Sequence, residues 1–188
     1  MTDLTERFQS ALAFATELHR HQRRKGTKIP YVSHLLGVAS IALEIGADED
    51  QAIAALLHDA VEDQGGAPCL DEIRERFGDR VASIVADCTD ADTEPKPPWR
   101  ARKEAYIASL SHKPAESLLV SLADKTHNAR AILDDLVVHG PSLWERFTGG
   151  QEGSLWYYDE LARAFRNHLP GPAADRLEFV VREMHRVA

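Results

Sequence analysis

The chain has 188 residues, of which 44% are hydrophobic, and this is enough apolar material for a sizeable core in one domain. Its formal charge of −8 at pH 7 argues against a nucleic-acid-binding or anionic-membrane-binding surface, because such a surface needs a dense patch of Lys and Arg. No stretch approaches the roughly 20 apolar residues that span a bilayer, and the N-terminal residues lack the apolar core of a signal peptide.

The two cysteines, Cys69 and Cys88, indicate a reducing compartment. Their spacing is not that of a metal motif, and they form no disulfide framework, so we expect two reduced thiols. Together with the missing signal segment, this predicts a soluble, cytoplasmic protein. The sequence does not indicate the oligomeric state.

The first 46 residues predict two helices joined by a loop that is rich in cations. Apolar residues recur at helical spacing from residue 4 to 22. The segment 26–30, Gly-Thr-Lys-Ile-Pro, breaks this pattern, because glycine and proline disfavour a helix. A second helical pattern covers residues 32–45 and ends at Gly46.

A third helix is expected to begin at Asp48 and Gln51, which have the spacing of a capping box. It continues through the apolar run 52–57 and ends at the glycine pair 65–66. Two shorter helical patterns follow, with Gly78 between them. Up to this point, helix follows helix.

Residues 89–98 cannot continue a helix, because their prolines remove backbone donors and restrict the residues that precede them. They predict a loop near the functional site. Helical patterning resumes at Trp99, stops near residues 111–114 and resumes through residues 118–133. Later elements are expected to begin near Pro141, Ser154 and Pro172.

The sequence therefore predicts an all-α fold. Strand-like alternation never persists for more than a few residues, internal repeats are absent, and no linker is long enough to separate two domains. We expect a single compact domain over residues 1–188, built from about nine or ten helices. Residues from about 140 to 188 are expected to form C-terminal helices that pack on the rest.

His58 and Asp59 are the strongest candidates for a functional site. They directly follow the apolar run of the third predicted helix, and Glu62 and Asp63 come soon after them. Burying an ionisable group costs free energy unless a metal or a partner compensates. Such groups at the end of a core-facing run therefore usually have a structural or functional role. At 3.6 residues per turn, His58 lies over Glu62, and Asp59 lies over Glu62 and Asp63. One helical face is therefore expected to carry an imidazole and three carboxylates.

His34 and Asp124 complete a candidate metal site with His58 and Asp59. Two imidazoles and two carboxylates form a mixed nitrogen and oxygen set that suits a divalent ion such as Mn²⁺, Fe²⁺ or Zn²⁺. With only four protein ligands, an octahedral ion keeps open positions for water and phosphate. A buried hydrogen-bonded network of the same side chains without a metal is the alternative interpretation.

The order of His34, His58-Asp59 and Asp124 resembles that of the HD phosphohydrolase superfamily, whose helical fold agrees with the pattern above. Four segments look more narrowly like the hydrolase domain of RelA/SpoT homologues. They are 23–25 (RRK), 31–34 (YVSH), 56–63 (LLHDAVED) and 122–130 (LADKTHNAR). The match spans most of residues 8–135, and without an accompanying synthetase region the chain resembles a stand-alone small alarmone hydrolase.

This resemblance implies a reaction and a set of site residues. Such proteins use Mn²⁺ to remove the 3′-diphosphate of ppGpp-type nucleotides. By resemblance, the metal ligands are His34, His58, Asp59 and Asp124, and the catalytic pair is Glu62 and Asp63. The implied nucleotide-binding residues are Arg24, Lys25, Tyr31, Lys96, Asn128 and Tyr157. One divalent ion is expected, because dinuclear HD enzymes have two or more further histidines before the final aspartate and this chain has only His112 there.

The chain also departs from that family. The usual His-Pro is His34-Leu35 here, which alters a turn rather than a ligand. In the family, the tyrosine that Tyr157 resembles is preceded, about one turn earlier, by a phosphate-binding arginine, whereas this chain has Gly153 at the end of the segment Gln-Glu-Gly. The preference between guanine and adenine nucleotides therefore stays open.

Two rival functions also stay open. An enzyme of the same chemistry could act on adenine alarmones, NADPH or a deoxynucleotide, and a metal-dependent nucleotide-binding module would bind without turnover. The pair Glu62 and Asp63 favours an enzyme. Apart from a small nucleotide, no nucleic-acid or membrane partner is expected. Among the remaining histidines, His127 is not expected to be a ligand, and His19 is expected to be a surface or structural residue.

Overall fold

The computed structural model describes residues 2–89 and 97–188, so that the predicted nucleotide contact of Lys96 lies outside the described residues. Within these ranges the fold is all-α, as predicted. Nine α-helices and three short helical turns form the regular structure of the described residues, apart from one isolated antiparallel bridge between Arg23 and Pro30. No helix in the same ranges is long and apolar enough to cross a membrane.

Apart from the end of α3, the helices lie where the sequence pattern predicts them, with ends that differ by a few residues. The N-terminal helices are α1 (Glu6–Leu18), α2 (Val32–Glu44), α3 (Glu49–Leu57), α4 (Gly66–Phe77) and α5 (Asp79–Cys88). The C-terminal helices are α6 (Trp99–Ser109), α7 (Ala115–His139), α8 (Gly150–His168) and α9 (Pro172–Val187). The short turns are η1 (Val61–Gly65), η2 (Leu110–His112) and η3 (Gly140–Arg146). The predicted capping box is confirmed, because Asp48 and Gln51 each accept the other's backbone N–H through a side-chain oxygen.

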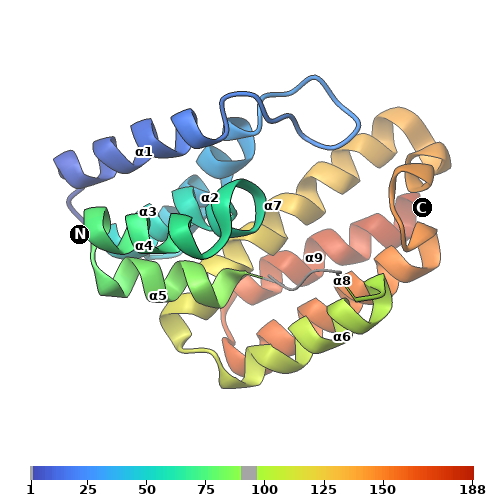
Figure 1. The fold of residues 1–188 in the computed structure, drawn as a ribbon. Helices are drawn as coiled ribbons and strands as arrows, with labels where there is room; N and C mark the ends of the chain where they lie inside the picture. Colours follow the sequence, from blue (N-terminus) through green and yellow to red (C-terminus); the bar gives the residue numbers. More distant parts are fainter. Residues whose placement is uncertain (1, 90–96) are drawn as a thin grey trace.

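Two apolar clusters form the core, and α7 contributes to both. The first cluster joins α1 to α5 and includes Val120 and Ala123 of α7. The second joins α6, α8 and α9 and includes Leu122 and Ala129 of α7. Figure 1 shows α1 to α5 on one side of the molecule and α6, α8 and α9 on the other. A residue in the middle of α7 therefore lies near the boundary between the two clusters.

The end of α3 differs from the prediction. This helix stops at Leu57, His58 and Asp59 lie in a turn, and η1 is a π-helical turn that holds Glu62 and Asp63. A π turn pairs residues i and i+5 instead of i and i+4, so the spacing of 3.6 residues per turn does not hold through η1. The prediction of one continuous α-helix up to the glycine pair is therefore wrong, although the Asp63 N–H still donates to the Asp59 carbonyl at 3.0 Å, so that one helical turn separates these two residues.

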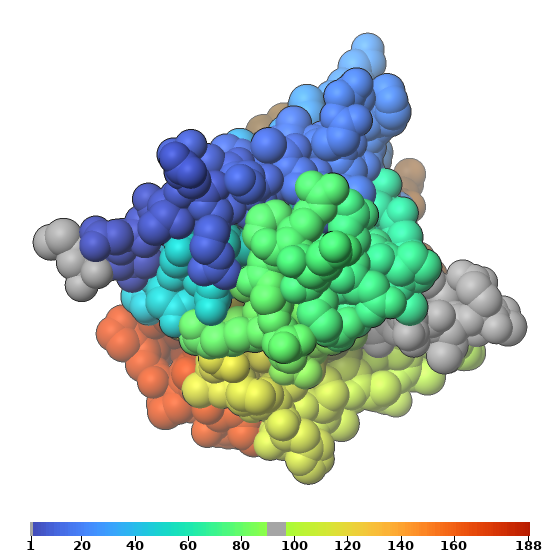
Figure 2. All heavy atoms as spheres, turned by 60° about the vertical axis from the view of Figure 1, so that its left-hand side comes forward, coloured from blue at the N-terminus to red at the C-terminus, as the bar shows by residue number. Residues whose placement is uncertain are grey.

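The loop after α1 projects beyond the helices, as the light-blue segment shows in Figure 1 and again in Figure 2. The N–H of Arg24 donates to the carbonyl of Ile29 at 2.9 Å, which closes the loop into a turn. Gly26 has a φ of +72°, a conformation that residues with a Cβ rarely adopt. This turn places the cations Arg24 and Lys25 beside the body of the protein.

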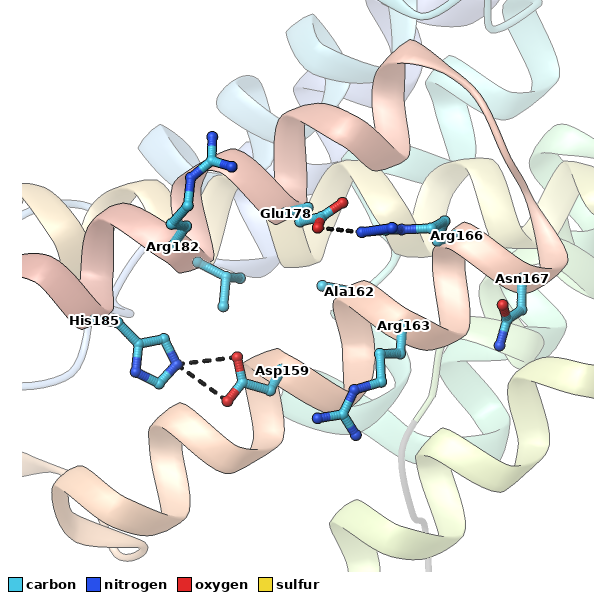
Figure 3. A pocket seen from close by; sticks show the side chains of 9 residues that line it. Asp159, Ala162, Arg163, Arg166, Asn167, Glu178, Arg182 and His185 are labelled. Atoms are coloured by element: carbon cyan, nitrogen blue, oxygen red, sulfur yellow. Dashed lines mark hydrogen bonds and ion pairs between the residues drawn. The ribbon is translucent and has the colours of Figure 1, made fainter.

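The C-terminal helices α8 and α9 pack on each other and on α7. A groove of about 690 Å³ lies between α8 and α9 and is lined by side chains of these two helices alone. Figure 3 shows two ion pairs that cross it, between Arg166 and Glu178 and between His185 and Asp159. We propose that residues 1–188 form one domain, in which residues 140–188 are attached through α7.

Candidate metal centre

The four predicted metal ligands converge at the boundary between the two apolar clusters. His34 comes from the first turn of α2, His58 and Asp59 follow α3, and Asp124 lies in α7. Asp59 Oδ2 lies 3.4 Å from His34 Nε2 and 3.0 Å from His58 Nε2. Asp124 Oδ1 lies 3.3 Å and 3.5 Å from the same two nitrogens. Each imidazole therefore faces both carboxylates.

The orientation of His58 suits a metal ligand. Its Nδ1 donates to the carbonyl oxygen of Ala55 at 2.9 Å, so Nε2 is the nitrogen that faces the two carboxylates and is available to bind an ion. His58 is 2% exposed, and its Nε2 makes no hydrogen bond within the described part of the chain. A buried nitrogen of this kind is expected to have a partner, and a cation between the two carboxylates would be one.

His127 fixes the ring of the other imidazole ligand. The Nδ1 atoms of His34 and His127 lie 2.9 Å apart. Burial, together with the nearby His34 and Arg24, lowers the pKa of His127 to about 4, so its ring is neutral at pH 7. When His34 binds an ion through Nε2, its Nδ1 carries the proton and donates it to His127. His127 is therefore a hydrogen-bond partner of the candidate ligand His34.

The electrostatics of the site favour a bound cation. Burial alone would raise the pKa of Asp59 and of Asp124. The neighbouring His58, and for Asp124 above all Lys125, outweigh this effect and hold both pKa values well below the usual range. Burial also opposes the charging of His58, but Asp59 and Asp124 raise its pKa well above the usual value. Both carboxylates are thus ionised. A divalent cation that binds between them would have to displace the proton of His58, so binding of the cation and of the proton is competitive.

Two further side chains hold Asp124 in place. Lys125 Nζ donates to Asp124 Oδ2 at 2.7 Å, and Asn128 Nδ2 donates to Oδ1 at 2.6 Å. Asn128 is one helical turn after Asp124. Arg24 Nη2 then donates to Asn128 Oδ1 at 2.9 Å. This series of hydrogen bonds connects the projecting loop to the candidate metal ligand.

Tyr31 holds the other carboxylate. Its hydroxyl donates to Asp59 Oδ2 at 2.6 Å. Burial and the Asp59 carboxylate raise the pKa of Tyr31 well above its usual value, so the phenol stays protonated and remains a donor. Its ring also meets His34 edge-on, with centroids 5.5 Å apart. Tyr31 therefore orients the candidate ligand Asp59 and also packs against the candidate ligand His34.

A cavity of about 450 Å³ collects four of the predicted nucleotide-binding residues, Arg24, Lys25, Tyr31 and Asn128. A smaller cavity of about 190 Å³ has Tyr157 in its wall. The two cavities share four lining residues, Asn128, Ile132, Phe147 and Tyr158. Tyr157 is only 6% exposed and packs edge-on against Trp99 and Tyr158, so it belongs to the core as well as to the cavity wall.

Glu62 and Asp63 lie on η1, which follows the candidate ligands His58 and Asp59 in the chain. Glu62 is half-buried, whereas Asp63 is exposed. The amide nitrogen of Gln22 donates to Asp63 Oδ2 at 2.8 Å, which connects η1 to the loop after α1. The pair remains the predicted source of proton-accepting groups beside the candidate metal ligands.

The metal-binding interpretation agrees with comparisons to known proteins. The HD domain family model matches residues 11–145, which is more than half of the chain. The chain belongs to the HD domain family. The resemblance noted from the order of histidines and aspartates is thereby confirmed, and the site of this HD domain protein, with one ligand atom from each of His34, His58 and Asp59 within 4.8 Å of one another, suits a divalent metal ion.

Several relatives of the chain are named as guanosine-3′,5′-bis(diphosphate) 3′-pyrophosphohydrolases. The chain is 43% identical over 123 residues to the guanosine-3′,5′-bis(diphosphate) 3′-pyrophosphohydrolase MESH1 of Xenopus tropicalis, covering 64% of this chain and 66% of that protein. It is 35% identical over 142 residues to MESH1 of Drosophila melanogaster, covering 73% and 74%. A pyrophosphohydrolase of Aquifex aeolicus is 35% identical over 68% of this chain, but the match spans only 18% of that longer protein.

A solved structure extends the likeness to the whole fold. A metazoan orthologue of SpoT, described as hydrolysing ppGpp, is 27% identical with a TM-score of 0.80, covering 97% of this chain and 98% of that one. A Listeria monocytogenes protein is 30% identical with a TM-score of 0.72, covering 81% and 99%. The all-α fold is therefore that of other HD domain proteins.

Sequence reasoning missed three partners of the HD domain site: Lys125, His127 and Gln22. Each is a single polar residue on a helix or loop, and such residues are usually solvated. Lys125 and His127 flank Asp124 and Asn128 closely in the sequence, and this proximity was the available signal. For Gln22, the only signal was its place just before the cation-rich loop.

Gly37 gives a direct test of the role of His127. It lies one turn after His34 on α2, and a Cβ at this position would meet the His127 ring within 3.0 Å. We expect Gly37→Ala to displace that ring and to weaken Mn²⁺ binding by about 10- to 100-fold, the usual cost of losing a hydrogen-bond partner of a metal ligand. Calorimetric titration measures this, with Ser40→Ala on the exposed side of α2 as the control. An unchanged affinity in Gly37→Ala would contradict the role of His127.

Proposed function

We propose that this protein is a metal-dependent phosphohydrolase that removes the 3′-diphosphate of (p)ppGpp-type nucleotides and releases pyrophosphate. The observation that carries the proposal is the convergence of His34, His58, Asp59 and Asp124 beside the carboxylates of η1 and a cation-bearing cavity. The names of the MESH1 relatives support the same reaction.

The proposed cofactor is one Mn²⁺ ion. His34 and His58 would supply nitrogen ligands, and Asp59 and Asp124 would supply oxygen ligands, a set that suits a borderline divalent ion. When bound, the ion supplies Lewis acidity, because it lowers the pKa of a water molecule and neutralises charge on the diphosphate. Tyr31, Lys125 and Asn128 hold the two carboxylates in the orientation that this requires.

The cavity of about 450 Å³ is the proposed nucleotide site. This volume falls within the range of about 300 to 1,000 Å³ that small-molecule sites usually have. Arg24 and Lys25 bring positive charge to it, and the planar guanidinium of Arg24 can pair with phosphate oxygens or stack on a base. Asn128 lines this cavity and donates to Asp124, so the cavity adjoins one of the proposed ligands.

Glu62 and Asp63 are proposed to orient the attacking water and to accept its proton. The water oxygen forms a bond to the phosphorus next to the ribose, and the bond between that phosphorus and the 3′ oxygen breaks. The 3′ oxygen then takes up a proton, and pyrophosphate is the other product. General acid–base help of this kind typically contributes about 10² to 10⁴ in rate.

The described residues say less about the choice between guanine and adenine nucleotides than about the reaction. The residue one turn before Tyr157 is Gly153, whose backbone lies against the Trp99 ring. A Cβ at this position would lie 3.2 and 3.3 Å from two carbons of the Trp99 ring, a tight contact that requires the ring to shift by a few tenths of an ångström. An indole therefore lies near Tyr157 where the family that the sequence resembles has an arginine. We propose ppGpp as the substrate and retain ppApp, NADPH and deoxynucleotides as the alternatives.

The test is a release assay on purified protein with Mn²⁺ and a small panel of substrates. We expect pyrophosphate from ppGpp or ppApp, the matching nucleoside 5′-phosphate product, and little reaction with nucleotides that lack a 3′-diphosphate. Faster release of single phosphate from NADPH or a deoxynucleotide would transfer the assignment to those substrates. Nucleotide binding without any product would instead support a binding module.

A further inference from the structure

His19 is buried although its position at the end of an exposed helix suggests a surface residue. It forms the C-cap of α1 and is 2% exposed. Ala11 and Ala15 precede it at intervals of four residues on the buried side of α1. A buried imidazole that is not one of the proposed metal ligands requires a reason.

The first reason is a hydrogen bond to Gln22. His19 Nδ1 lies 2.6 Å from Gln22 Oε1, and Gln22 Nε2 lies 2.8 Å from Asp63 Oδ2. An ionised carboxylate only accepts hydrogen bonds, so the amide atom that faces Asp63 must be the NH₂ group. The amide oxygen then faces His19, and His19 must carry its proton on Nδ1.

The other contacts of His19 and Gln22 agree with a proton on His19 Nδ1 and with the Gln22 amide oxygen facing it. Gln64 Nε2 donates to the same Gln22 oxygen, so that oxygen has two donors. The 3.4 Å separation of Gln64 Nε2 and His19 Nδ1 then joins two donors and is not a hydrogen bond. His19 Nε2 has no partner in the described part of the chain, which suits an unprotonated nitrogen better than a buried N–H. Burial lowers the pKa of His19, which is consistent with a neutral ring.

The second reason is the Tyr31 ring. The rings of His19 and Tyr31 stack with centroids 5.2 Å apart and an angle of 17° between their planes. Tyr31 in turn donates to Asp59. The Tyr31 N–H also donates to the Gln22 carbonyl at 3.1 Å, so Gln22 and Tyr31 are held together by their backbones. The His19 ring therefore contacts both Gln22, which donates to Asp63, and Tyr31, which donates to Asp59.

We infer that His19 and Gln22 are positioning residues for Asp63, with the proton on His19 Nδ1 selecting the amide orientation that presents NH₂ to the carboxylate. This inference rests on the proposed function, in which Asp63 belongs to the proton-handling pair. Without His19, either amide orientation of Gln22 is accessible. An amide oxygen facing Asp63 would push the carboxylate away, and displacements of about 1 Å in a catalytic site can cost on the order of 10² in rate.

Two substitutions of His19 separate its two contacts. His19→Phe keeps a flat ring against Tyr31 but removes the donor, and we expect kcat to fall about 10- to 100-fold with KM and Mn²⁺ affinity unchanged. His19→Asn places an NH₂ group near the position of Nδ1 but removes the ring, and we expect it to recover most of kcat with a lower Tm. His21 is exposed and nearby, so His21→Phe and His21→Asn are the matched controls and should resemble the wild type.

A double-mutant cycle tests whether His19 acts through Gln22. Gln22→Met keeps the length of the side chain and removes the amide, and we expect a loss of kcat similar to that of His19→Phe. Adding His19→Phe to Gln22→Met should then cause no further loss, because the two residues serve one contact. Losses that multiply, or a normal kcat in His19→Phe, would overturn the inference.

A measurement without substrate keeps the inference testable even if the variants fold poorly or the proposed function fails. The panel of substrates on wild-type protein decides the proposed function. Nitrogen-15 NMR of the wild-type imidazoles decides the inference, because we expect His19 to be protonated on Nδ1 at neutral pH. We also expect a slowly exchanging Gln22 NH₂ resonance. A His19 that is protonated on Nε2 would refute the arrangement, whatever the substrate is.

Discussion

Replacing Glu62 with glutamine is expected to lower kcat by about 10² to 10⁴-fold, while the affinities for Mn²⁺ and for the nucleotide stay near those of the wild type. The substitution keeps the size of the side chain and removes only the carboxylate that can accept a proton. Glu62 lies on η1 and is not one of the four proposed ligands, so the metal site should be unaffected. Pyrophosphate release measures kcat, and calorimetric titration of Mn²⁺ measures binding.

The comparison that gives this experiment its meaning is Asp59→Asn. Because Asp59 is a proposed ligand, the activity of the Asp59→Asn variant should partly recover at high Mn²⁺, whereas the activity of Glu62→Gln should not. Glu75→Gln on the exposed side of α4 serves as the control for loss of one negative charge. Near-wild-type turnover in Glu62→Gln with unchanged metal affinity would leave Asp63 as the proton-accepting residue.

Local signals predicted the helices well. The capping box at Asp48 and Gln51 is a short-range pattern with its own hydrogen bonds, and α3 begins there. The end of α3 was predicted less well, because the π turn after Asp59 depends on how the chain packs rather than on residue type. The sequence indicated which residues follow the apolar run, but it could not show that the Asp63 side chain accepts a hydrogen bond from Gln22.

The metal ligands were easier to recognise than the residues that hold them. His34, His58, Asp59 and Asp124 are residue types that bind metals, and their order along the chain by itself suggests coordination chemistry. His127 and Gln22 are single polar residues, and their roles depend on distances of 2.9 Å and 2.8 Å across separate elements. His19 had a weak signal, since it continues the buried spacing of Ala11 and Ala15. Only the fold turns that spacing into a contact with Tyr31.

The position of α7 explains why one domain can combine these parts. Its middle brings Asp124 to the imidazoles of the N-terminal cluster, and Asn128, one turn later, reaches Arg24. The same helix packs Leu122 and Ala129 into the C-terminal cluster. A displacement of α7 would therefore alter the proposed metal site and the nucleotide cavity together.

The second large effect expected is a metal-dependent gain in stability that Asp59→Ala removes. An ion that binds only the folded protein adds RT ln(1 + [L]/Kd), about 2.7 kcal/mol at a hundredfold excess over Kd. For a domain of this size, that corresponds to a rise in Tm of roughly 5 to 10 °C. Melting curves with chelator and with added Mn²⁺ measure the rise.

The informative quantity is the difference between the two curves of one variant, not the Tm of either. Asp59→Ala removes a carboxylate from between two imidazoles and leaves the Tyr31 hydroxyl without its acceptor, so the metal-free Tm can itself shift. Subtracting the chelator curve cancels that shift. Asp63→Asn, outside the proposed ligand set, should keep the full rise. If the wild-type protein melts at the same temperature in both conditions, the four side chains form a buried hydrogen-bonded network instead of a metal site.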